Sequence, residues 1–186
     1  WHSFPVPPPP AAEATTFDLD ENSAGRPSLC RLAASLHFLA DGMIFGTWAA
    51  LIPFFKAKFG VSEATLSIVL LAIAAGAIVS MPVTGSLVAR HGSRRNLRFF
   101  APGFGLSLLL LVLAPNFGLF IAAAFLFGAF KGAFNVSVNT QAITVENALR
   151  KPVIPSFHAL WSFGGMLAAF AVGAAFAGGN VIPFAR

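Results

Sequence analysis

Several polar residues lie within one of the most apolar parts of the chain, in the segment FGAFKGAFNVSVNTQAITVE. Lys131, Asn135 and Asn139 are spaced four residues apart, so they would share one face of a helix. Glu146 continues that side two turns later, near a helix end where water could solvate it. A charged side chain at the centre of a membrane costs about 2.5 to 3.5 kcal/mol on insertion-based scales. The stripe is therefore expected to face protein or a water-filled cavity.

Two kinds of chemistry would suit this stripe of Lys131, Asn135 and Asn139. It could form a seam of hydrogen bonds to a neighbouring helix, each worth about 0.6 kcal/mol in membrane proteins. It could instead line a cavity that binds a solute, and this interpretation is favoured because a lysine requires a counter-charge or water. The asparagine amides would then bond a hydroxylated or amide-bearing solute, whereas Lys131 would attract an anionic group.

The candidate counter-charge for Lys131 is Asp41, in the segment SLHFLADGMIFGTWAAL, the only acidic residue well inside an apolar run. The two could form a permanent structural bridge. Alternatively, an unpaired Asp41 would favour its protonated form in apolar surroundings and could carry a proton. His37 lies one turn before Asp41 on the same face and could titrate near neutral pH. Asp41, Lys131, Asn135, Asn139 and His37 are thus the predicted substrate- or ion-binding residues.

Helices that cross a membrane would position these groups. The 186-residue chain is 56% hydrophobic and 10% charged, whereas soluble domains carry about 25% charged residues. Five apolar runs reach the length of about 20 residues that a spanning helix needs. They cover approximately residues 32–55, 64–88, 97–114, 117–145 and 157–182. We therefore predict an all-α fold, a polytopic membrane helix bundle with five transmembrane helices.

Small residues recur at helical spacing within three of these runs and predict close helix packing, because they let backbones approach. They include Gly76 in the second run, Gly128 and Gly132 in the fourth, and Gly165 and Gly173 in the fifth.

The N-terminal region before the first run differs in composition. WHSFPVPPPPAAEATTFDLDENSAGRPS is rich in proline, acidic and small residues, which cannot bury a core. It also lacks the basic and then apolar regions of a secretory signal. We predict a disordered tail over 1–30 and a transmembrane helical domain over 31–186. The first residue is Trp1 and not methionine, which suggests a piece of a longer reading frame.

Lysine and arginine residues are distributed unequally between the two ends of the runs. One end holds Arg26, Arg31, Arg90, Arg94, Arg95, Arg98, Arg150 and Lys151, and the other holds Lys56, Lys58 and Arg186. Because cytoplasmic ends are enriched in these residues, we expect the larger group and the N-terminus in the cytoplasm. The same distribution argues against nucleic-acid binding despite the net charge of +5, since a nucleic-acid face clusters its cations.

The sequence contains no pattern typical of an enzyme or cofactor site. It has no His/Cys/Asp/Glu cluster with metal-ligand spacing, no phosphate-binding loop, no dinucleotide fingerprint and no serine nucleophile elbow. The single cysteine, Cys30, cannot form an internal disulfide. We predict a protein that is not an enzyme and that needs no cofactor or metal.

The segment GSLVARHGSRRNLR, between the second and third runs, resembles the signature G-x-L-x-D-R-x-G-R-R of the major facilitator superfamily. The matching residues are Gly85, Leu87, Arg90, Gly92, Arg94 and Arg95. Gly85 would allow close helix approach, Gly92 would permit a tight turn, and the arginines would anchor the cytoplasmic side. Ala89 stands where the family has an aspartate, so it cannot join the charge network that the resemblance implies.

A closer resemblance extends from about residue 35 to the end of the chain. FGTWAALIPFFKAKFGVSEATLS, MPVTGSLVARHGSRR and VIPSFHALWSFGG are similar to segments of uncharacterised bacterial inner-membrane facilitators, themselves distantly similar to fucose permease. The resemblance implies twelve spans in two halves with the solute between them. This chain would then be most of the N-terminal half, whose first and fourth helices line the cavity, and its partner would be the missing C-terminal half.

The main functional hypothesis is a fragment of a secondary transporter in the bacterial inner membrane. It would move a small polar solute, sugar-like or another metabolite, by alternating access and with proton symport through Asp41. One alternative is a drug or metabolite exporter of the same superfamily, although GGMLAAFAVGAAFAGG lacks the proline of the exporter motif. Another is a truncated membrane protein that does not transport. The lipid bilayer, a small solute and protons are the expected partners.

Overall fold

The computed structural model describes residues 27–178, in which six helices follow one another. They are α1 (Pro27–Ala50), α2 (Ile52–Phe59), α3 (Glu63–His91), α4 (Ser93–Leu113), α5 (Phe117–Leu149) and α6 (Ile154–Ala177). Most of the predicted N-terminal tail, and residues 179–182 of the fifth predicted span, lie outside the described residues. Residues 27–30 form the start of α1, where the sequence had suggested the end of a disordered tail.

The predicted all-α membrane bundle is confirmed. Within residues 27–178, five helices are long and apolar enough to cross a membrane, with α1 and α2 counted as one span from Ser28 to Phe59. The bend between these two helices lies at Leu51, whose amide still donates to the Thr47 carbonyl at 3.0 Å. Proline near the start of α2 has no amide hydrogen to continue the helical ladder, which accounts for the break in α1–α2.

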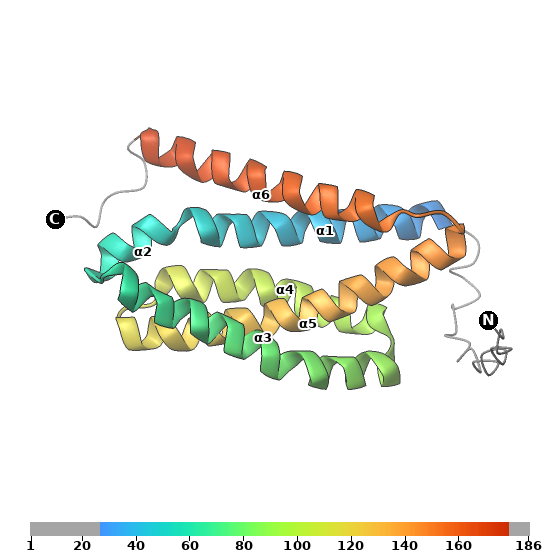
Figure 1. Cartoon of the computed structure of the whole chain (residues 1–186), viewed down its shortest axis with the longest axis horizontal. Helices are drawn as coiled ribbons and strands as arrows, with labels where there is room; N and C mark the ends of the chain where they lie inside the picture. Colours follow the sequence, from blue (N-terminus) through green and yellow to red (C-terminus); the bar gives the residue numbers. More distant parts are fainter. Residues whose placement is uncertain (1–26, 179–186) are drawn as a thin grey trace, which may run out of the picture.

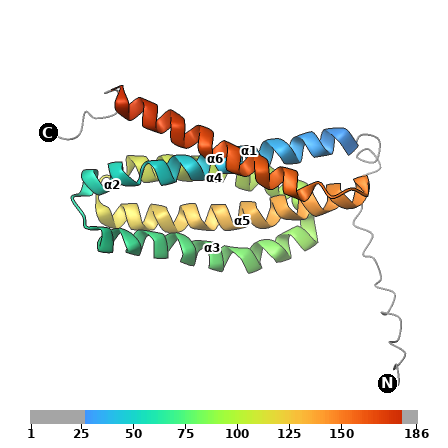
Figure 2. The same ribbon diagram turned by 45° about the horizontal axis from the view of Figure 1, so that its top comes forward.

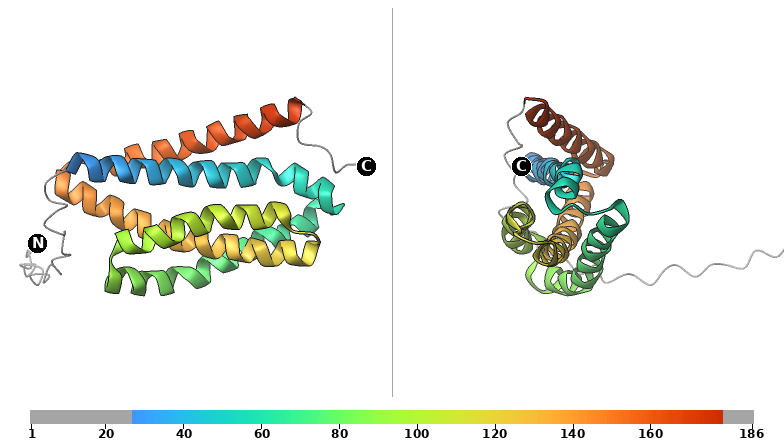
Figure 3. Two further views of the ribbon diagram at one scale, coloured as in Figure 1. Left: turned by 180° about the vertical axis from the view of Figure 1, so that it is seen from behind. Right: turned by 90° about the vertical axis from the view of Figure 1, so that its left-hand side faces the viewer.

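The helices form two groups that lie side by side (Figures 1 and 2). α1 packs along α6, while α5 packs against both α3 and α4. The end-on view in Figure 3 shows the α1–α6 pair on one side and the other three long helices on the other. α5 also contacts α1. Side chains on α5 can therefore reach both groups, which makes this helix the natural carrier of a site at their junction.

Glycines allow the α3–α5 contact to be very close. A Cβ at Gly76 would collide with the backbone of Phe125, and a Cβ at Gly128 would collide with the backbone of Ile73. At Gly132 it would meet the backbone of Ala77. Because lipid provides no hydrophobic drive for helix association, such backbone contact is an important source of packing energy. The small-residue spacing in the second and fourth runs therefore predicted a real interface.

The α1–α6 contact is equally close, but its register differs from the expectation. A Cβ at Gly42 or Gly164 would collide with the facing backbone of α6 or α1, respectively, and a Cβ at Gly46 with that of Gly165. At Gly173, by contrast, a Cβ would meet no atom within 4 Å in the described part of the chain. The prediction that Gly173 belongs to the packed stripe is therefore wrong within the described residues, where this glycine faces open space.

Charged and polar side chains complete several helix ends. Asn116 accepts the Leu119 amide at 2.9 Å, and Lys58 donates to the Val112 carbonyl at the end of α4 at 2.7 Å. Glu146, which the sequence left as a residue that could simply be solvated, has a structural role. Its Oε2 accepts the amides of Val153 and Ile154 at 2.8 and 2.9 Å. An anionic carboxylate at a helix N-terminus is favourable, so Glu146 fixes the turn between α5 and α6.

Candidate functional site

The candidate site is centred on an ion pair between α1 and α5. Lys131 Nζ lies 2.6 Å from Asp41 Oδ1 and 2.7 Å from Oδ2, so the ammonium contacts both carboxylate oxygens. Asp41 is only 2% exposed, whereas the side chain of Lys131 retains 18% of its exposure. The buried partner is thus the acid, and the base is the partner that remains partly accessible.

Burial explains why these two residues must meet. Each lies on a helix that is otherwise apolar enough to span a membrane. Removing a carboxylate or an ammonium from water costs several kcal/mol, and mutual attraction offsets this only when the geometry is good. Asp41 and Lys131 meet this condition with two short contacts. The ion pair therefore favours the register of α1 against α5 that brings Asp41 and Lys131 together.

Aromatic rings surround the Lys131 ammonium. Its Nζ lies 5.5 Å from the ring centroid of Phe45, 5.7 Å from that of Phe104 and 5.9 Å from that of Trp161. These rings come from α1, α4 and α6, so every helix group contributes to the site. Cations are attracted to aromatic faces within about 6 Å. We call Phe45, Phe104 and Trp161 the aromatic cage of Lys131.

Sequence reasoning missed the aromatic cage. Phe45 could have been found, because it lies four residues after Asp41 and so shares its helix face. Phe104 and Trp161 carried no such signal, since their approach to Lys131 depends on how α4 and α6 pack.

The two asparagines of the predicted stripe bond to each other. Asn139 Nδ2 donates to the backbone carbonyl of Asn135 at 2.8 Å and to its Oδ1 at 2.9 Å. Both residues are half-buried. Between Pro27 and Gly178, neither amide bonds to another helix, so these residues do not form the interhelical seam considered above. Their arrangement leaves the Asn135 amide nitrogen one turn from Lys131 on a partly accessible face.

Two histidines lie near the pair on different helices. His37 Nδ1 is 2.7 Å from the Ala33 carbonyl of its own helix, and its ring centroid lies 6.0 Å from that of Phe134. His158 packs edge-on against Phe38 at 5.3 Å. The structure therefore brings Asp41 and Lys131 together, whereas His37 bonds a carbonyl of its own helix. Within residues 27–178, His37 forms no hydrogen bond with the pair.

The signature segment forms the tight turn between α3 and α4. Gly92 alone separates the two helices and has φ of 77° and ψ of 154°, a conformation that favours glycine. Ser93 follows and donates to Gln141 Oε1 of α5 at 2.9 Å. Arg90, Arg94 and Arg95 are exposed around this turn. The turn is thus anchored to α5, the helix that carries Lys131.

The expected role of Gly85 is not seen. A Cβ at Gly85 would meet no atom within 4 Å among the described residues, so it does not mediate close helix approach there. Gly85 is followed by the remaining turns of α3 before the chain reverses at Gly92. Of the two signature glycines, only Gly92 has a conformational requirement in this structure.

Replacing Gly92 with alanine should destabilise the protein by about 1 to 3 kcal/mol, because a Cβ is strained at this combination of φ and ψ. Gly85→Ala is the matched control and should change stability by less than about 0.5 kcal/mol. Unfolding of the purified protein in a detergent series, followed by circular dichroism, measures both. Equal losses for the two variants would contradict the assigned role of Gly92.

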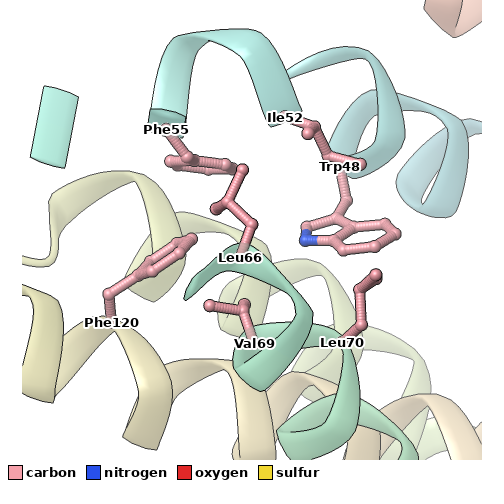
Figure 4. A pocket seen from close by; sticks show the side chains of 7 residues that line it. All are labelled: Trp48, Ile52, Phe55, Leu66, Val69, Leu70 and Phe120. Atoms are coloured by element: carbon pink, nitrogen blue, oxygen red, sulfur yellow. The ribbon is translucent and has the colours of Figure 1, made fainter. Parts of the chain in front are cut away.

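A second feature, an apolar hollow at the bend between α1 and α2, is a poorer candidate site. It is lined by Trp48, Ile52, Phe55, Leu66, Val69, Leu70 and Phe120 (Figure 4). Trp48 Nε1 is buried there without a hydrogen-bond partner among the described residues. This single donor contrasts with the charged and polar groups around Lys131. The ion pair is therefore the better candidate for solute or ion chemistry.

Comparison with known proteins gives a consistent family assignment. The family model of the Major Facilitator Superfamily matches residues 33–184. The uncharacterised transporter y4wD of Sinorhizobium fredii is 41% identical over 132 residues, covering 71% of this chain and 35% of the relative. An uncharacterised MFS-type transporter of Yersinia pestis is 36% identical over 144 residues, covering 77% of this chain and 38% of the relative.

Membrane protein MosC of Rhizobium meliloti is 33% identical over 132 residues, covering 71% of this chain and 32% of that protein. No solved structure gives a significant match. The chain spans about a third of the length of the curated relatives it matches. The family match covers most of the described helices, including both residues of the ion pair. The chain therefore belongs to the Major Facilitator Superfamily, a family of membrane transporters and not of enzymes.

Proposed function

We propose that this chain is the N-terminal half, without its sixth span, of a secondary transporter for a small polar solute. The complete protein would alternate access to a central site by rocking two halves around it. The chain would lie in a bacterial inner membrane with its N-terminus in the cytoplasm, consistent with the unequal distribution of lysine and arginine. The matched relatives are bacterial and about three times longer than the matched region, which supports this interpretation.

The observation that carries the proposal is the Asp41–Lys131 pair. Two charges within apolar helices are costly and typically mark solute, ion or proton pathways in membrane proteins. The pair lies where the two helix groups meet, and Lys131 retains partial exposure. Asn135 and Asn139 continue its face of α5 and supply hydrogen-bonding amides. A purely structural bridge would need neither the partly accessible lysine nor the adjacent amides.

Proton symport would act through Asp41. Among the described residues, the charged and titratable groups around its carboxylate are Lys131 of α5 and His158 of α6, with His37 one turn away on α1. Protonation of the carboxylate would weaken its contact with Lys131 and free the ammonium for a solute. This sequence of events would couple proton entry to solute binding.

The test uses this chain within its complete reading frame, reconstituted into vesicles with an imposed proton gradient. Uptake of polar solutes by the unmodified protein should rise with an inwardly directed gradient, whereas Asp41→Asn should remove that dependence. The direction of the stimulated flux separates import from export. Unchanged proton dependence in Asp41→Asn would reject Asp41 as the proton carrier, and absence of any solute flux would favour a membrane protein that does not transport.

A further inference from the structure

The ion pair is asymmetric toward its surroundings. The Asp41 side chain is 3% exposed and the Lys131 side chain is 18% exposed. A solute that reaches the pair from the partly accessible face of α5 therefore meets the Lys131 side chain before the Asp41 carboxylate. The adjacent Asn135 amide nitrogen can also donate a hydrogen bond. The groups offered to such a solute are predominantly donors, which suits an anion.

The geometry points to a small hydroxylated monocarboxylate as the solute, bound by Lys131 in place of the Asp41 carboxylate. This inference rests on the proposed transport function and specifies its substrate class. Lys131 already holds a carboxylate through both oxygens, at 2.6 and 2.7 Å. A solute carboxylate can reproduce these contacts, and Asn135 and Asn139 can bond its hydroxyl groups. A neutral sugar would leave the lysine without a counter-charge once it separates from Asp41.

Charge balance supports the exchange. In the structure the pair carries one negative and one positive charge, so the site is neutral overall. When Asp41 takes up a proton it becomes a neutral acid, and Lys131 is left with an uncompensated positive charge. A bound monocarboxylate restores neutrality. Because one proton enters with one monovalent anion, the complete cycle moves no net charge across the membrane.

The aromatic cage gives Lys131 a stable position during this exchange. Phe45, Phe104 and Trp161 approach the ammonium from three helices, at 5.5 to 5.9 Å. Attraction to aromatic faces does not depend on the charge of Asp41, so it persists after that carboxylate is protonated. The ammonium is thereby held where the solute carboxylate arrives. Phe45 and Trp161 are half-buried, so they can also contact the carbon skeleton of the solute.

The experiment compares solutes that share a skeleton and differ in charge. Vesicles containing the complete protein are supplied with glucuronate, glucose or glucosamine, and separately with gluconate or sorbitol. A potassium gradient with valinomycin sets the membrane potential independently of the proton gradient. We expect uptake of a carboxylate that rises with an inward proton gradient and is unaffected by the membrane potential. Empty vesicles provide the background for passive entry.

Two substitutions of the same lysine separate ligand binding from structural support. Lys131→Gln should reduce carboxylate uptake about ten- to a hundredfold, the usual effect of losing a hydrogen bond to a charged group. Lys131→Arg should retain most of it, because arginine keeps the charge and can bind both carboxylate oxygens. Phe45→Leu should raise the KM for the carboxylate about two- to fivefold, as expected for the loss of one partly accessible aromatic contact. Uptake is normalised to the amount of folded protein in each preparation.

Several results would overturn the inference. These are preferential uptake of glucose, sorbitol or glucosamine, carboxylate uptake that follows the membrane potential, or no uptake of either carboxylate. Equal carboxylate uptake by Lys131→Gln and the unmodified protein would also overturn the inference. Uptake of a neutral solute driven by protons would reject the substrate class and leave the proposed transport function intact. If the unmodified protein showed no proton-driven flux of any solute, both the substrate class and the proposed proton-coupled transport would be rejected.

Discussion

Replacing Lys131 with methionine should destabilise the bundle by about 3 kcal/mol or more, because it leaves a carboxylate buried without a counter-charge. Asp41 is 2% exposed, so water cannot take the place of the lost ammonium without local opening of the helices. The free energy of unfolding in mixed detergent micelles, followed by circular dichroism, measures the change. Adding Asp41→Asn to this variant should recover more than half of the loss, since a neutral amide is much less costly to bury than a charge.

The same protein contains a matched control pair at the membrane border. Lys56 Nζ lies 2.8 Å from Glu63 Oε1, but the two side chains are 44% and 85% exposed. Exposed pairs contribute about 0 to 1 kcal/mol, so Lys56→Met should have little effect. Similar losses of stability for Lys56→Met and Lys131→Met would show that burial does not determine the cost of breaking the Asp41–Lys131 pair. A double variant as unstable as Lys131→Met alone would show that the charge left on Asp41 is not the cause.

Much of the fold could be predicted because a membrane restricts the choices. Long apolar runs must form helices, since hydrocarbon offers no partner for free backbone groups. The meeting of Asp41 and Lys131 followed from the same reasoning, because each is costly alone and α1 and α5 can bring them to comparable depth. Both inferences use energies large enough to exclude most alternatives.

The surroundings of the pair could not be predicted in this way. The chain has 21 phenylalanines, so composition gives no reason to select Phe104 as a neighbour of Lys131. The contact depends on how α4 is rotated against α5, and many rotations bury similar apolar area. The same limit explains the error at Gly173, where the spacing suited packing but a Cβ would meet no described residue within 4 Å.

Glu146 illustrates a third situation, in which the sequence permits a local interaction but does not show that it forms. Its carboxylate bonds amides seven and eight residues later, across the turn into α6. Acidic residues at helix N-termini are favourable, but the sequence does not reveal which side chain folds back over a turn. A weak preference of this kind becomes definite only when the helices on both sides fix the turn. An arrangement that avoids a large energetic cost, such as the Asp41–Lys131 pair, can therefore be predicted from sequence. An arrangement that gains only a small energy, such as the Glu146 contact, cannot.

Replacing Gly128 with leucine should largely abolish folding of the bundle. Even a Cβ at this position of α5 would collide with the backbone of Ile73 in α3. Backbone atoms cannot move aside as a flexible side chain can, so the two helices would have to separate. Overpacking usually costs about 1 to 3 kcal/mol and can exceed this when no side chain can yield. The expected result is loss of the monodisperse peak when the solubilised protein is examined by size-exclusion chromatography.

Gly173→Leu provides the matched control. It adds the same side chain to another spanning helix, at a position where a Cβ meets no atom of the described residues within 4 Å. It should leave the elution profile unchanged. Equal loss of folded protein in the two variants would mean that any added bulk in a spanning helix is harmful, irrespective of the α3–α5 contact. A selective loss for Gly128→Leu would instead tie folding to this contact, and α5 carries Lys131. The separation of α3 and α5 would therefore also displace the lysine from Asp41, so that packing at Gly128 and pairing at the site depend on the same placement of α5.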